Sequence, residues 1–307
     1  MLSRTASSLY WIGRYMERAE FTTRLVEATI RLAALGGHDH VSKAWMSALS
    51  VVGGPPLDVS REGSMARRYL TLSEDNPSSI RSCIVSARDN ARAGRTALTR
   101  EVWEAINRAW LMIQARTSPG GVQATLNLVE ELKAELRGFE GAMARMMRNE
   151  GYWFVRLGSM IERGDASARL LDVKYFLLLP EGQKVGGKLD RDQWTTILQI
   201  VSAKTAYRHL YREALKPWLV ADMLIFRREL PRSLAWTAEE TVELLGEFGA
   251  RSGRQGPADR LARQRLSKLQ ALDIDTVFQR GLHQWLQAYV RENNAIGVAI
   301  ADQFRFT

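Results

Sequence analysis

Residues 13–27 of the chain read GRYMERAEFTTRLVE, and residues 158–172 repeat the same pattern as GSMIERGDASARLLD. In both stretches a glycine is followed by Glu-Arg, a second acid, a hydroxyl-bearing residue, Arg-Leu and a final acid, all at the same spacing. Neither stretch contains a proline, and each has apolar or small residues every three or four positions. This period is typical of a helix with one buried face. The pattern therefore predicts two related helices.

Two further pairs of similar segments follow in the same order along the chain. They are WMSAL at 45–49 with WTTIL at 194–198, and NPSSI at 76–80 with LPRSL at 230–234. Three ordered matches indicate an internal repeat. We expect an all-α fold that arose by duplication of a helical unit of about 150 residues. The two halves, 1–150 and 151–307, should pack as one compact unit around a pseudo-twofold axis, with equivalent helices side by side.

Composition agrees with a helical, globular chain of 307 residues. Hydrophobic residues make up 46% and charged residues 25%, with only 8 prolines, which excludes wholesale disorder and argues against a β-sandwich or barrel. Long helices are expected over residues 8–35 and 276–304. No apolar run approaches the roughly 20 residues that span a bilayer. With no signal peptide in view and Cys83 as the single cysteine, we expect a cytoplasmic protein with a buried thiol.

The repeated stretch places acids and arginines in an ordered row. At about 100° per residue, Gly13, Glu17, Glu20, Arg24 and Glu27 share one stripe of the first helix, away from its apolar seam. The second helix repeats the stripe, and within each stripe an acid stands four residues before an arginine, as a salt bridge requires. Arg18 and Arg163 point to a third side, toward the other copy. The candidate binding residues are Glu17, Arg18, Glu20, Arg24, Glu162, Arg163, Asp165 and Arg169.

Two interpretations of this row remain open. In the first, it is a polar network that holds the two halves in register. In the second, the two helices cross and bring four acids and up to four arginines into one pocket, which would suit an amino acid, a peptide terminus or a phosphoanhydride. Glu17 and Glu162 are then the candidate general bases.

Other candidate sites carry less signal. A second cationic row could bind phosphate or an acidic partner; it consists of Arg81, Arg88, Arg92 and Arg95 with Asn90, and Arg232 lies in the matching LPRSL segment. His38 and His40 stand two apart in an apparent loop without a third ligand, so we expect no metal site. The net charge of +9 comes without a basic block interleaved with aromatics, so nucleic-acid binding is not expected.

The opening segment LSRTASSLYWIGRYMERAE, residues 2–20, resembles the start of the bacterial alpha-E family, a helical domain named for its Glu-Arg motif. Further matches are NPSSI at 76–80, ARDNAR at 87–92, LTREVWE at 98–104 and LPRSL at 230–234, so the resemblance spans nearly the whole chain. Asp89 stands where glutamate is common in the family, which keeps the charge.

The resemblance implies partners and a class of function. Alpha-E domains are typically encoded beside, or fused to, circularly permuted ATP-grasp proteins and transglutaminase-like proteases, which suggests ATP-dependent formation of amide or peptide bonds. This chain is then expected to be an accessory or substrate-binding partner of an ATP-grasp ligase, which itself would use ATP and Mg²⁺. The alternatives are an enzyme that completes amide formation by acyl transfer, and a purely structural scaffold. Neither a cofactor of its own nor a membrane association is expected, and homo-oligomerisation stays open.

Overall fold

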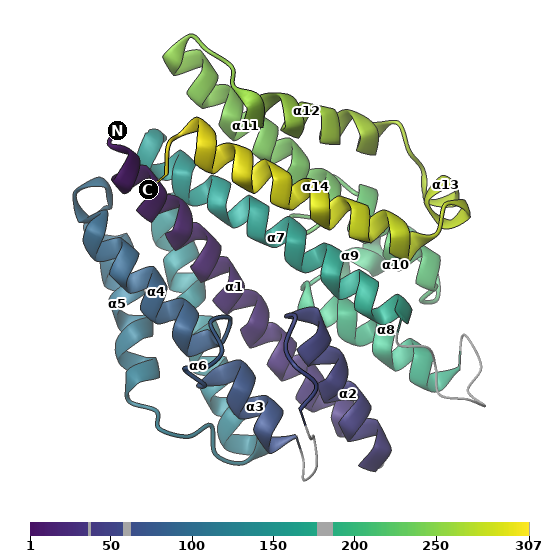
Figure 1. Cartoon of the computed structure of the whole chain (residues 1–307). Helices are drawn as coiled ribbons and strands as arrows, with labels where there is room; N and C mark the ends of the chain where they lie inside the picture. Colours follow the sequence, from purple (N-terminus) through teal and green to yellow (C-terminus); the bar gives the residue numbers. More distant parts are fainter. Residues whose placement is uncertain (36–37, 58–62, 177–186, 307) are drawn as a thin grey trace.

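The chain folds entirely into helices over the residues that the computed structural model describes, which are 1–35, 38–57, 63–176 and 187–306 (Figure 1). The expectation of an all-α fold is confirmed. The helices of the first half are α1 Ser3–Ala33, α2 His38–Val51, α3 Ser64–Thr71, α4 Ile80–Ala93, the short 3-10 helix η1 Arg95–Ala97, α5 Arg100–Gln114 and α6 Val122–Ala144. Those of the second half are α7 Glu150–Phe176, α8 Lys188–Ile200, α9 Lys204–Tyr211, α10 Pro217–Phe226, α11 Leu234–Ser252, α12 Pro257–Gln270, α13 Ile274–Gln279 and α14 Leu282–Gln303.

Helices α1 and α7 run parallel through the middle of the molecule and form its most extensive helix pair (Figure 1). They are the helices that carry the repeated sequence. Their backbones touch at Gly13 and Gly158: a Cβ atom on Gly13 would lie 1.9 Å from the carbonyl oxygen of Val155, and one on Gly158 would lie 2.0 Å from that of Tyr10. These contacts are reciprocal, because Tyr10 and Val155 precede their own glycines by the same three residues.

Two apolar clusters lie one after the other along this central pair. The first contains α1 up to Ala19 and α7 up to Ile161, and the second begins at Phe21 on α1 and Ala166 on α7. Both clusters include residues from both halves of the chain. Glu20 on α1 and Glu162, Arg163 and Asp165 on α7 lie between these limits, and Glu17 and Arg18 directly precede Ala19, so these charged residues lie at the boundary between the two cores.

One helix of each half, α4 and α11, begins with the same kind of cap. On α4 the Oγ atom of Ser79 accepts a hydrogen bond from the backbone N–H of Ser82, and on α11 Ser233 does the same for Trp236. Each is an N-cap that satisfies an otherwise unpaired backbone donor. Helix α4 packs on α1, and α11 packs on α7. The duplication of the whole unit stays a prediction, but these caps and packing partners agree with it.

Several local expectations need correction. The long closing helix is broken into α13 and α14 at Gly281, which has a φ of +87° that favours glycine. His40 belongs to a helix rather than a loop, since α2 begins at His38. The helix expected over residues 8–35 begins and ends earlier, since α1 spans Ser3–Ala33. Cys83 is fully buried and burial raises its pKa to about 12, in keeping with an inert thiol. No helix among those described has the length and apolarity to cross a membrane.

The glycine contact predicts a severe effect of Gly13→Ala. The added methyl group would overlap the backbone of α7, so the helices must separate, at a cost on the order of 3 kcal/mol. Gly141→Ala on α6 is the matched control, because nothing lies within 4 Å of its Cβ position, and it should stabilise by about 0.5–1 kcal/mol. Urea denaturation of both variants measures the difference; equal effects would contradict the close crossing.

Candidate functional site

The Glu-Arg pairs of α1 and α7 bind each other across the helix crossing. Arg18 donates from Nε to Glu162 Oε1 at 2.6 Å and from Nη2 to Oε2 at 3.0 Å. In the other direction, Arg163 donates from Nε and Nη2 to the two oxygens of Glu17 at 2.8 and 2.6 Å. Both carboxylates are buried, with exposures of 4% for Glu17 and 5% for Glu162. Bidentate geometry of this kind gives the strongest hydrogen bonds between side chains.

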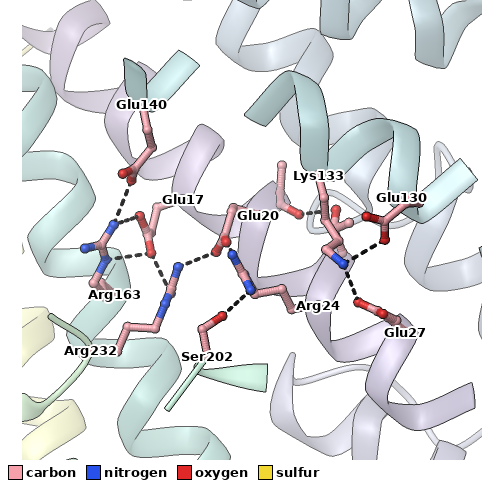
Figure 2. Close-up of polar contacts among 12 residues, drawn as sticks. Glu17, Glu20, Arg24, Glu27, Glu130, Lys133, Glu140, Arg163, Ser202 and Arg232 are labelled. Carbon is pink, nitrogen blue, oxygen red and sulfur yellow. Dashed lines mark hydrogen bonds and ion pairs between the residues drawn. The ribbon is translucent and has the colours of Figure 1, made fainter. Parts of the chain in front are cut away.

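A first cluster, named here the Glu17 cluster, consists of Glu17, Glu20, Arg24, Arg163 and Arg232. Arg232 enters from the turn before α11 and donates to Glu17 Oε1 at 3.0 Å and to Glu20 Oε2 at 2.6 Å, so that its guanidinium joins the two acids (Figure 2). Arg24 donates from Nε to Glu20, as the spacing of four predicts, and also contacts Ser202. Every carboxylate oxygen of this cluster is therefore bound to a guanidinium group.

A second cluster, named the Glu162 cluster, consists of Arg14, Arg18, Glu162, Asp165 and Arg169. Arg14 donates from Nε to Glu162 Oε2 at 2.6 Å, and Arg169 donates from Nε to Asp165 Oδ2 at 2.6 Å. The remaining oxygen of Asp165, Oδ1, is buried and has no hydrogen-bond partner. This cluster thus differs from the first in leaving one acceptor unsatisfied.

A cavity of about 280 Å³ opens beside the Glu162 cluster. Its polar wall is formed by Arg18, Glu162, Asp165 and Arg169 together with Thr22 and Ser78; apolar side chains such as Phe21 and Val52 complete it. Thr22 is fully buried, and its hydroxyl oxygen also lacks a hydrogen-bond partner. Asp165 and Thr22 both line this cavity, and each has one buried polar atom without a hydrogen-bond partner, which is costly unless a ligand or water satisfies it.

The sequence left two interpretations open, a polar network and a single pocket, and the structure distributes the candidate residues over two clusters. The eight candidate binding residues divide equally: Glu17, Glu20, Arg24 and Arg163 belong to the Glu17 cluster, and Arg18, Glu162, Asp165 and Arg169 to the Glu162 cluster. No hydrogen bond or ion pair within the described ranges joins the two. The reason is that Arg18 and Arg163 cross the helix interface in opposite directions, which separates the acids they bind.

Electrostatics make Glu17 and Glu162 poor general bases. Burial alone raises the pKa of each carboxyl, but the guanidinium groups outweigh it: Arg163 and Arg232 hold the pKa of Glu17 at about 2, and Arg14 and Arg18 lower that of Glu162. A general base works best with a pKa near the operating pH. Asp165 is different, because burial raises its pKa and Arg169 only partly compensates. The geometry thus points to charge pairing and binding rather than to proton abstraction.

The second cationic row is engaged with its own surroundings. Arg81 donates to the carbonyl oxygens of Ile113 and Arg116, Arg88 lies 3.9 Å from the ring centre of Trp110, and Arg95 donates to the carbonyl of Leu98. Asn90 bonds the carbonyl of Ser86, while Arg92 is exposed. These contacts attach α4 to neighbouring elements. Arg232 does not belong with this row, since it lies in the Glu17 cluster.

Sequence reasoning missed three residues of the site. Arg14 binds Glu162, yet the matching position of the second copy is Ser159, so the repeat gave no reason to select it. Thr22 is the hydroxyl-bearing residue of the repeated pattern, and the pattern gave it no role in binding. Ser78 matches Arg232 in the aligned segments NPSSI and LPRSL, and this difference in sequence was the one available signal that the two clusters differ. The described residues also hold no group of histidine, cysteine or acidic side chains suited to a metal ion.

Comparison with known proteins places the chain in a family. A family model named Alpha-E, described as a predicted alpha-helical domain with a conserved ER motif, matches residues 1–304. The chain therefore belongs to the Alpha-E family, and its two Glu-Arg pairs, Glu17-Arg18 and Glu162-Arg163, are those that bind across the helix crossing. Neither the curated proteins nor the solved structures gave a match.

The low pKa of Glu17 predicts a specific acid sensitivity. A carboxyl with an ordinary pKa of 4.5 that falls to about 2 on folding stabilises the protein fully above pH 4.5, and this contribution of roughly 3 kcal/mol is lost as the pH falls through 2. Glu17→Gln should remove that pH dependence and take away the buried carboxylate that Arg163 and Arg232 share, at a cost of about 3–5 kcal/mol at pH 7.

Urea titrations between pH 7 and pH 2 measure this. Glu140→Gln is the control, since Glu140 also binds Arg163 but is half exposed, and it should cost less than about 1 kcal/mol. If Glu17→Gln and Glu140→Gln lower the free energy of unfolding by the same small amount, the buried network does not stabilise the fold.

Proposed function

We propose that the chain is an accessory, substrate-binding partner of an ATP-grasp amide or peptide ligase, and that it binds an amino acid or a peptide terminus at the Glu162 cluster. The ligase would supply ATP and Mg²⁺, and a transglutaminase-like protease belongs to the same proposed set of partners. We place the complex in the cytoplasm. The proposal of a ligase partner is supported by the family's Glu-Arg motif and by the ATP-grasp proteins that the alpha-E resemblance implies as neighbours.

The observation that carries the binding proposal is the difference between the two clusters. In the Glu17 cluster the guanidinium of Arg232 occupies the space between the two acids. In the Glu162 cluster the matching residue is Ser78, the matching acids are Glu162 and Asp165, and a cavity of about 280 Å³ takes the place of that side chain. A group with cationic N–H donors fits the unsatisfied Asp165 Oδ1, as Arg232 fits Glu20.

The same cavity also offers a place for a carboxylate. Arg169 donates to Asp165 from its Nε atom alone. Within the described part of the chain its two terminal nitrogens make no hydrogen bond, so they can bind a ligand. Arg169 is also partly exposed at the wall of the cavity. An ammonium group on Asp165 and Thr22, with a carboxylate on Arg169, gives the charge order of an amino acid or of a peptide end. The volume lies at the small end of ligand pockets and suits a compact molecule.

Asp165→Asn is expected to weaken amino-acid binding without unfolding the protein. The amide removes the charge that attracts an ammonium group, and the loss of a charge-assisted hydrogen bond of about 1.5–3 kcal/mol weakens binding roughly 10- to 150-fold. The fold should survive, because burial already disfavours the charged form of Asp165, as its raised pKa shows. Calorimetric titration with a panel of amino acids and dipeptides measures the affinity.

Glu20→Gln is the matched control, because Glu20 holds the same place in the cluster already filled by Arg232. It should leave the affinity unchanged. In the wild type, binding should weaken as the pH falls through the raised pKa of Asp165, at a higher pH than for an ordinary aspartate. Binding that is lost equally in both variants would argue against this location.

Association with the ligase is tested separately by co-purification of the chain with the ATP-grasp protein encoded nearest to it. We expect a complex, and amide formation by the ligase that rises when the chain is added. Asp165→Asn should retain the complex but lose the stimulation. Turnover by the chain alone would favour the acyl-transfer alternative, and neither association nor stimulation would leave only a structural scaffold.

A further inference from the structure

A second cavity, of about 460 Å³, lies between α12 and α14, next to Arg280 at the end of α13. Its charged wall consists of Arg265 and Lys268 from α12, Arg280 after α13, and Glu292 from α14. Trp285 and Tyr289, one turn apart on α14, form an aromatic wall with their rings stacked at a centroid distance of 6.0 Å. None of these residues belongs to the Glu17 or Glu162 clusters.

Arg265 is the unusual member of this wall. It is only 3% exposed, and its contacts are one hydrogen bond from Nη1 to Asn293 Oδ1 and the ring of Tyr289, whose centre lies 5.2 Å from its guanidinium carbon. Its Nε atom is buried without a partner, and no ion pair connects it to a carboxylate in the described parts of the chain. A buried charge without a counter-ion is expensive.

The rest of the wall does not supply that counter-ion. Glu292 is the one acid of the cavity, and it is paired with Lys268 at 2.6 Å. Arg280 adds a further positive charge at the exposed rim. The cavity is therefore positively charged and lined on one side by aromatic rings. The hydroxyl of Tyr289 is buried away from this wall, next to Gly164 of α7, so the residue offers its ring to the cavity.

We propose that this cavity binds a small aromatic oxyanion, a carboxylate or phosphate, whose charge pairs with Arg265 and Arg280 and whose ring packs against Trp285 and Tyr289. The anion supplies the counter-ion that Arg265 lacks, and guanidinium groups suit planar or tetrahedral oxyanions because of their forked donors. The ring contact adds apolar burial and directional stacking. The proposal is independent of the binding of amino acids at the Glu162 cluster.

Isothermal titration at constant ionic strength tests this with four probes: benzoate, phenyl phosphate, inorganic phosphate and phenol. We expect at least one of the aromatic anions to bind saturably, at least tenfold more tightly than inorganic phosphate or phenol. The first comparison removes the ring and the second removes the charge. No saturable binding of either aromatic anion would overturn the proposal.

Variants then locate the site. Arg265→Met should lower the affinity for the aromatic anion tenfold or more, while the free protein keeps or gains thermal stability, because a buried ion is replaced by an apolar side chain of similar length. Arg280→Ala, at an exposed position, should weaken binding several-fold without changing stability. Arg260→Ala, exposed on the same helix but outside the cavity, and Asp165→Asn should leave binding within twofold.

These variants also separate a ligand site from a structural arginine. Unchanged affinity in both Arg265→Met and Arg280→Ala would overturn the proposal even if an aromatic anion binds elsewhere. If Arg265→Met fails to fold, Arg280→Ala alone decides, because its side chain is exposed and makes no contribution to the core.

Discussion

The fold depends on four charged side chains that form ion pairs between α1 and α7 at their crossing. Glu17 with Arg163 and Glu162 with Arg18 are taken out of water between two apolar cores, where an unpaired ion would cost several kcal/mol. The arrangement holds because each glutamate receives more than one guanidinium, and because the two glycines let the helix backbones approach closely enough for short side-chain contacts. Glycine and the Glu-Arg pair therefore act as one unit.

This unit fixes the register of the whole bundle. A shift of one residue along α1 would rotate Glu17 by about 100° away from Arg163 and bring a Cβ atom into the place of Gly13, so it would lose the ion pairs and the close contact together. Apolar packing alone tolerates exchanges of similar side chains far better. The helices α2, α4, α6, α8, α11 and α14 all pack on the central pair, so their positions follow from that register.

The sequence was sufficient to predict what helical periodicity controls. It predicted the helical class, the pairing of Glu20 with Arg24 and of Asp165 with Arg169, and the reach of Arg18 and Arg163 toward the other copy. It failed where a distant segment decides the outcome. Arg232 reaches Glu17 from the turn before α11, and the spacing of residues on α1 gives no information about this contact. The acids also separated into two clusters, because the direction in which an arginine crosses an interface depends on the partner helix.

The two copies of the motif differ next to the residues that cross the helix interface. Both need two acids and a pair of arginines at the crossing, so neither copy can lose them without unpairing the other. The two clusters differ at the loop residues Arg232 and Ser78, which hold matching positions in the segments LPRSL and NPSSI. A long cation there closes the Glu17 cluster, whereas a short serine leaves a cavity, with the buried acceptors of Asp165 and Thr22 at its wall. One loop position therefore distinguishes a cluster whose carboxylate oxygens are all bound by arginines from a cluster that borders a cavity.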